Sequence, residues 1–133
     1  MRAVLDPNVI ISGLLSGTGA PARLLAAWQE GRVEVIVSPM LLAELERALA
    51  YPKLRAHISA QDATAVVGLL AAGATSVDDP PQPPAVRSED PGDDCLIALA
   101  AADRAALVSG DKHLLALRER IPVYSPRELL ELI

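Results

Sequence analysis

The chain has 133 residues, of which 51% are apolar and only 2% aromatic, so its core must be built from Leu, Ala, Val and Ile. The scarcity of aromatic side chains argues against a site that binds nucleobases by stacking. A formal net charge of −5 argues against a polyanionic partner, unless bound cations offset the carboxylates. We expect one domain over residues 1–133.

The amino-acid sequence shows no recognisable targeting signal. The N-terminus lacks the basic start, long apolar stretch and cleavage site of a signal peptide. No apolar run approaches the roughly 20 residues that span a bilayer. The one cysteine, Cys95, cannot form an internal disulfide, and its Ala/Leu-rich surroundings predict a small buried thiol. These features predict a cytoplasmic protein with no membrane partner.

In the first half of the chain, β-type runs alternate with helical patterns. Strands are expected over 2–6 and 33–37, the second β-branched throughout most of its length, as in strands covered on both faces. Proline and serine signals at Pro21, Ser38-Pro39 and Ser59 mark helix starts. The expected helices cover about 8–15, 21–30, 39–50 and 59–73, with a break at Tyr51-Pro52.

The second half begins with a proline-rich stretch, 78–84, which predicts an exposed connector because proline lacks a backbone donor. The elements expected after it are a helix over 94–103, a strand over 106–109, a helix over 112–120, a strand over 122–124 and a helix from Ser125-Pro126 through Leu132. This alternation predicts a three-layer α/β/α sandwich around a mainly parallel sheet, because each return to a parallel strand needs a crossover.

Four acidic residues stand close to points where a β-type run gives way to a helix: Asp6, Glu44, Asp94 and Asp111. Parallel sheets gather such junctions along one edge, where carboxylates from distant segments can share a divalent cation. Simpler roles exist for each. Asp6 and Asp111 can cap helices, and Glu44 can be a solvated residue at the edge of a helix.

An acidic segment precedes the helix expected at 94–103, with four acids within residues 89–94. One or two of them can stabilise a helix N-terminus, but four exceed that need, and a bound cation explains their proximity. Asp94 directly precedes the apolar run and is best placed to face inward, with Asp93 as the alternative. His57 and His113 lack zinc-site spacing, so Mg²⁺ or Mn²⁺ is the expected metal.

Four motifs, taken in order, resemble the PIN-domain nucleases and more narrowly the VapC-like toxins of bacterial toxin–antitoxin pairs. They are Leu5-Asp6-Pro7-Asn8-Val9, Ser38-Pro39 followed by Glu44, Asp94-Cys95-Leu96-Ile97-Ala98 and Ser109-Gly110-Asp111-Lys112-His113-Leu114. The likeness covers nearly the whole chain. One departure is Pro7, where the family usually carries Thr after the first Asp.

The resemblance implies a Mg²⁺- or Mn²⁺-dependent endonuclease acting on single-stranded or structured RNA, paired with a cognate antitoxin and forming a homodimer. The family's acidic residues map onto Asp6, Glu44, Asp94 and Asp111, with Asn8 and Ser109 as supporting polar groups and Asp93 as an alternative ligand.

The mechanistic hypothesis is that a metal-bound water attacks a phosphodiester bond. A basic rim for the phosphate backbone is expected from Arg23, Arg47, Lys53, Arg55, Arg87 and Lys112. Two alternatives stay open. One is a Mg²⁺-binding receiver-like signalling domain, which has no role for a helical Glu44. The other is a catalytically silent PIN-like binding module in which Pro7 has disabled the site.

Overall fold

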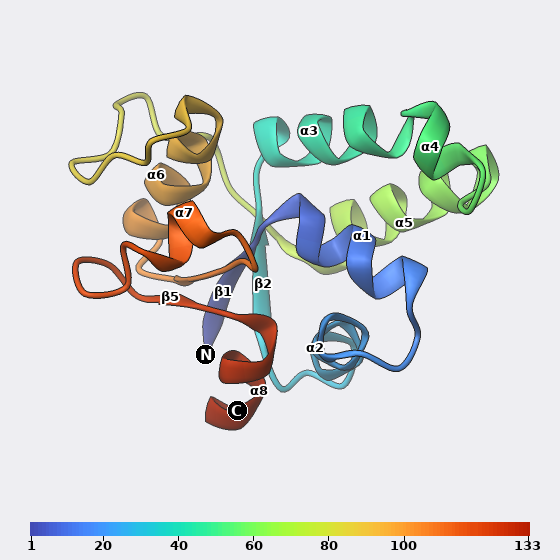
Figure 1. Cartoon of the computed structure of the whole chain (residues 1–133), viewed down its shortest axis with the longest axis horizontal. Helices are drawn as coiled ribbons and strands as arrows, with labels where there is room; N and C mark the ends of the chain where they lie inside the picture. The colour runs from blue at the N-terminus through green and yellow to red at the C-terminus, as the bar shows by residue number, and fades with distance from the viewer.

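A computed structural model describes all residues, 1–133, and its centre is a five-stranded parallel sheet in the order β3-β2-β1-β4-β5 (Figure 1). The strands are β1 (Arg2–Leu5), β2 (Glu34–Val37), β3 (Thr75–Ser76), β4 (Ala106–Val108) and β5 (Val123–Tyr124). Each neighbouring pair is parallel. The central β1 pairs with β2 on one side and β4 on the other. The strand order therefore reverses at β1, the place where parallel sheets open a crevice at their carboxyl ends.

Helices lie on both sides of the strands, as expected for three layers (Figure 1). They are α1 (Pro7–Leu15), α2 (Ala20–Gln29), α3 (Pro39–Leu49), α4 (Pro52–Arg55), α5 (Ala60–Gly73), α6 (Asp94–Ala102), α7 (Lys112–Leu115) and α8 (Pro126–Leu132), with a 3₁₀ turn, η1, at Pro91–Asp93. Packing joins α1 to α2 and α3, α3 to α5, and α6 to β1 and β4. The expected α/β/α sandwich is confirmed.

Helix starts follow the capping signals in the sequence. The Ser38 hydroxyl accepts a hydrogen bond from Leu41 N, and the Ser59 hydroxyl accepts one from Asp62 N. Ser125 and Glu128 form a complete capping box, each side chain accepting from the other residue's backbone N–H. Reciprocal caps of this kind satisfy donors that a helix start leaves unpaired. Local chemistry therefore explains where these helices begin.

The helix expected over 112–120 is wrong beyond its first turn, because α7 ends at Leu115. Residues 116–120 form turns in which most backbone hydrogen bonds reach back three residues, as from Leu117 N to Leu114 O. In this segment Arg118 forms a bidentate ion pair with Glu128 of α8, with N–O distances of 2.9 and 3.0 Å. Such planar paired contacts are geometrically demanding, and here they hold the segment against α8.

Three short elements were not expected from the sequence: β3, α4 and η1. The strand β3 has two residues, both polar, so no apolar run announces it. It forms because it pairs with Ile36 and Val37 of β2. The break expected at Tyr51-Pro52 is a new start, with Pro52 opening the single turn of α4.

The core is aliphatic, as composition required. Its largest cluster has 29 buried residues, including all of β4 and the last three residues of β1 and of β2. These strands are buried without alternation, which is typical of a parallel sheet covered on both faces. No single helix is both long and apolar enough to cross a membrane. The helices α1 and α2 reach the length and hydropathy of a membrane span only when they are counted together, and the chain bends by 101° between them.

Candidate active site

Ser109 links two acidic residues at the carboxyl ends of the adjacent strands β1 and β4. Its hydroxyl donates to Asp6 Oδ2 at 2.7 Å and accepts from the backbone N–H of Asp111 at 3.0 Å. Ser109 is fully buried and Asp6 is 5% exposed. The short polar bridge fixes the Asp6 carboxylate relative to the backbone that carries Asp111.

Both of these acids also cap helices, as the simpler interpretation predicted. Asp6 Oδ1 accepts from Asn8 N at 3.0 Å, and Asp111 Oδ1 accepts from His113 N at 2.8 Å. Capping and ligand binding are compatible, because a carboxylate has two oxygens with about four acceptor positions. The caps orient the two side chains at the sheet edge.

A cavity of about 400 Å³ brings carboxylates from four separate segments together. We call it the acidic cleft, and its acidic lining residues are Asp6, Glu44, Asp90, Asp93 and Asp111. Asn8 of the predicted supporting residues also lines it, while Ser109 lies buried behind Asp6. Three of the four expected acids thus meet in one place.

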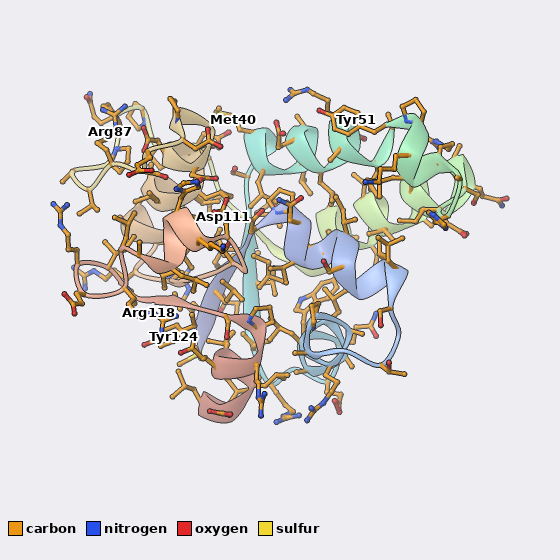
Figure 2. The ribbon with its side chains drawn as sticks, viewed as in Figure 1. Met40, Tyr51, Arg87, Asp111, Arg118 and Tyr124 are labelled. Carbon is orange, nitrogen blue, oxygen red and sulfur yellow. The ribbon has the colours of Figure 1, made fainter.

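The fourth expected acid, Asp94, does not line the acidic cleft. Its Oδ1 accepts from the backbone N–H of Ser88 at 2.9 Å, and its Oδ2 accepts from Arg87 Nε at 2.7 Å. The Ser88 hydrogen bond, helped by Arg87, holds the pKa of Asp94 below its usual value. Figure 2 shows Arg87 at the outer edge of the connector, away from Asp111. Asp94 therefore fastens the connector to the start of α6.

Asp93 occupies the cleft instead. Burial, followed by the charges of Asp111, Asp90 and Asp6, raises the pKa of Asp93 to about 6. Neighbouring residues near a helix start point about 100° apart, and the 3₁₀ turn η1 sets which of the two faces inward. The sequence could not resolve this choice between adjacent aspartates.

Glu44 lies on α3 at the rim of the cleft, with its side chain 55% exposed and paired with Arg47 one turn along the helix. No three His, Cys, Asp or Glu side chains lie close enough together in the structure to share one ion. For Glu44 to join a metal site its side chain must move, although only its Oε2 is paired with Arg47. Such exposed ion pairs contribute little, about 0–1 kcal/mol, so this rearrangement is inexpensive.

Sulfur atoms line another part of the cleft, where Cys95 Sγ lies 4.0 Å from Met40 Sδ. Cys95 is only partly buried, so the expectation of a buried thiol was wrong. Burial, with the charges of Asp79 and Glu44, raises the pKa of its thiol. The helical pattern hid this exposure, because α6 is apolar on nearly every face.

The carboxylates suit a hard divalent cation. Mg²⁺ and Mn²⁺ prefer oxygen ligands, and the acidic cleft supplies carboxylates from β1, α3, η1 and β4 or from the residues just after them. Burial is the largest cause of the raised pKa of Asp93, and the neighbouring charges of Asp111, Asp90 and Asp6 add to it. The histidines offer no zinc-type site: His57 is exposed, and His113 Nδ1 lies 3.1 Å from Glu89 Oε2.

The basic rim expected from the sequence does not surround the cleft, since no Lys or Arg lines it. Arg47 and Arg87 are paired with Glu44 and Asp94. Arg127 is the one Lys or Arg that lines the adjoining cavity. Sequence reasoning missed Arg127, because nothing around it distinguishes it from an ordinary surface charge in a terminal helix.

Comparisons with known proteins show the family and the fold of the chain. Residues 2–113 match the family model described as PIN domain. The chain is 28% identical over 141 aligned positions to the uncharacterized protein MJ1680 of Methanocaldococcus jannaschii, covering 98% of this chain and 90% of that protein. The fold of the present chain is similar to that of a chain in the crystal structure of VapBC2 from Rickettsia felis bound to a DNA fragment from their promoter. That match has a TM-score of 0.60 and 14% identity, and covers 94% of this chain and 98% of the other. With the match extending from β1 to the start of α7, the chain belongs to the PIN-domain family.

Proposed function

We propose that the chain is a divalent-metal-dependent endoribonuclease whose metal is held by Asp6, Asp93 and Asp111. Members of the PIN-domain family are generally nucleases. The observation that carries the proposal is the convergence of carboxylates from four segments in the acidic cleft. Glu44 completes the donor set after its side chain moves. Asp94 is outside the site in this proposal, because both of its oxygens are engaged by Ser88 and Arg87.

A bound Mg²⁺ or Mn²⁺ supplies Lewis acidity and a water of lowered pKa, which suits phosphodiester hydrolysis without a protein nucleophile. The chain's residues orient the reacting groups. Ser109 keeps the Asp6 carboxylate in place, so that this ligand needs little reorganisation on binding. Asn8 lines the cleft beside Asp6 and offers an amide donor to a phosphate oxygen.

The test is cleavage of a mixed RNA pool with Mg²⁺ or Mn²⁺, and with chelator. We expect cleavage only with metal, and its loss in Asp6→Asn, Asp93→Asn and Asp111→Asn. Asp62→Asn is the matched control, because Asp62 is exposed on α5 and lines neither the acidic cleft nor the adjoining cavity. Loss of activity that tracks unfolding in a thermal melt, instead of loss of the carboxylate, would contradict the site assignment.

A catalytically silent PIN-like module is the second candidate, favoured by two observations. Proline stands at position 7, next to Asp6, and Glu44 is already paired with Arg47. One observation counts against the silent module. Ser109, which follows β4, donates its hydroxyl to the Asp6 carboxylate, so the site does not depend on the hydroxyl of a threonine at position 7. Mn²⁺ binding, seen as an increase in melting temperature, without cleavage of any RNA would favour the silent module.

We further propose that the chain is the toxin of a toxin–antitoxin pair and forms a homodimer. The support for the toxin assignment is the shared fold with a chain of the VapBC2 structure, and the homodimer is proposed from the family resemblance of the sequence. Induced expression of the chain should arrest growth, and Asp93→Asn should relieve the arrest at equal protein level. Co-expression of a protein encoded beside it should relieve it too, and light scattering should give twice the 14.0 kDa chain mass. Unimpaired growth would contradict the toxin assignment.

A further inference from the structure

A second cavity, of about 550 Å³, adjoins the acidic cleft. The two share three lining residues, Asp6, Asn8 and Asp111. We call this cavity the side groove. Its volume lies in the range of pockets that bind small organic groups, about 300–1,000 Å³. A molecule bound over Asp6 and Asp111 can therefore extend into the side groove without leaving the protein surface.

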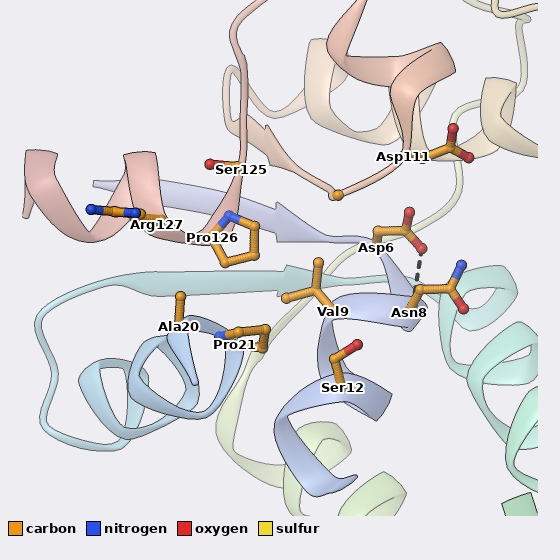
Figure 3. Close-up of a pocket in the computed structure, with 11 residues that line it drawn as sticks. Asp6, Asn8, Val9, Ser12, Ala20, Pro21, Asp111, Ser125, Pro126 and Arg127 are labelled. Atoms are coloured by element: carbon orange, nitrogen blue, oxygen red, sulfur yellow. Dashed lines mark hydrogen bonds between the residues drawn. The ribbon is translucent and has the colours of Figure 1, made fainter. Parts of the chain in front are cut away.

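The side groove is formed where α1, the start of α2 and the start of α8 approach one another (Figure 3). Beyond the shared residues, Ser12 and Ser125 contribute hydroxyls, and Pro21 and Pro126 contribute apolar surface. Figure 3 shows Arg127 at the end opposite Asp111. The Arg127 side chain is 85% exposed, and its nearest acid, Glu131, is 3.9 Å away. Its charge is therefore available to a ligand.

Charge separates the two directions in which a polyanion can leave the shared carboxylates. Toward the acidic cleft, beyond the proposed metal ligand Asp93, it meets Glu44 and Asp90. No lysine or arginine lines that cleft, and Arg47 beside it is already paired with Glu44. Toward the side groove it meets Arg127 and no further carboxylate. Because like charges repel and arginine binds phosphate well, the side groove is the favourable direction.

We propose that the side groove holds the nucleotide next to the scissile phosphate, with Arg127 binding a backbone phosphate. This inference rests on the proposed nuclease function, because it places the scissile phosphate at the carboxylates. Pro21, Pro126 and Val9 pack against sugar and base, and with no aromatic residue lining the groove the base is not held by stacking. The subsite thus binds the RNA backbone and accepts different bases.

The test is binding of a fluorescent single-stranded RNA by anisotropy, in an Asp93→Asn background that prevents cleavage. Arg127→Ala should weaken binding about three- to five-fold, and should lower the slope of log K against log salt by about 0.7, the value for one phosphate contact on a single strand. Arg120→Ala is the matched control, since Arg120 is exposed and lines neither cavity. It should change neither quantity.

Steric blocking of the side groove is a second, independent test. Ser12 is exposed on α1 and lines the side groove, so Ser12→Leu should fill the groove and weaken binding, whereas Ser12→Ala should not. Shortening the RNA one nucleotide at a time from each end should reach a length at which Arg127→Ala no longer matters. A merely structural role of Arg127 would not produce that dependence on length.

The outcomes separate this inference from the nuclease proposal. If the wild-type protein cleaves RNA, but Arg127→Ala and Ser12→Leu bind it with unchanged affinity and salt slope, the subsite is wrong. If Arg127→Ala weakens binding with the expected slope, but the wild-type protein cleaves no RNA with any metal, the side groove binds an RNA backbone, and the nuclease proposal fails together with the placement of a scissile phosphate.

Discussion

The hydroxyl of Ser109 donates a 2.7 Å hydrogen bond to the Asp6 carboxylate across the junction of β4 and β1. Both residues are buried, so neither group can exchange this partner freely for water. The same hydroxyl accepts from Asp111 N, and two acidic residues of the cleft therefore depend on one serine.

Ser109→Ala should lower the free energy of unfolding by about 1–3 kcal/mol, because it leaves a buried carboxylate oxygen of Asp6 without a donor. It should also weaken Mn²⁺ binding, measured as a smaller metal-induced rise in melting temperature. Ser59→Ala is the control. The Ser59 hydroxyl also accepts a hydrogen bond from a backbone N–H, but it does so at the start of α5 and not at the cleft. This substitution should cost about 1 kcal/mol and leave the metal response intact. Equal metal responses in the two variants would remove Ser109 from the site.

Asp93→Asn and Asp94→Asn should behave oppositely, although the residues are adjacent. Asp93→Asn relieves repulsion among the cleft carboxylates, so the metal-free protein should become more stable while metal-dependent cleavage is lost. Asp94→Asn weakens the contacts to Ser88 and Arg87, so stability should fall by about 1–2 kcal/mol. Cleavage by the folded fraction of Asp94→Asn should persist. The reverse pattern, in melts and cleavage assays of both variants, would restore Asp94 as the ligand.

The stability of the metal-free protein should depend on Asp93 between about pH 4 and about pH 6. The folded-state pKa of Asp93 is raised from 3.8 to about 6, so the folded state binds a proton more tightly than the unfolded state. Ionised Asp93 therefore destabilises the fold above about pH 6, and the cost disappears as the pH falls toward 4. After allowing for screening at this part-exposed site, we expect about 1 kcal/mol.

This pH effect is measured by urea unfolding of the wild-type protein and Asp93→Asn, with chelator present. The variant should be the more stable at about pH 7, and the difference should shrink by about pH 4.5. A difference that stays constant over this range would show that the carboxylate of Asp93 has an ordinary pKa.

Alkylation of Cys95 should report on the acidic cleft. Its raised thiol pKa leaves little thiolate at neutral pH, so labelling by iodoacetamide should be slow there and accelerate as the pH increases. A bulky maleimide attached to Cys95 should block cleavage, because the thiol lines the cleft. Cys95→Ala should cleave RNA normally and resist the maleimide. Full activity of the labelled wild-type protein would show that RNA does not enter beside Cys95.

Much of this protein follows from local sequence. Capping serines and prolines set the starts of α3, α5 and α8, because the hydrogen bonds that begin a helix involve residues close in the chain. The β-branched run ending at Val37 specifies a strand buried on both faces. The positions of Asp6, Glu44 and Asp111 at the cleft follow from the same pattern, since parallel strands bring their carboxyl ends to one edge.

Tertiary structure alone decided the rest. The sequence could not choose between Asp93 and Asp94, because one step along η1 separates a side chain in the cleft from one held by Arg87. It could not limit α7 to Leu115, since the ion pair of Arg118 with Glu128 joins the segment after α7 to another helix, α8. Nor could it identify Arg127, whose position depends on how α8 packs beside α2. Backbone hydrogen bonding near a helix start is local, whereas the direction in which a charged side chain points depends on every segment packed around it.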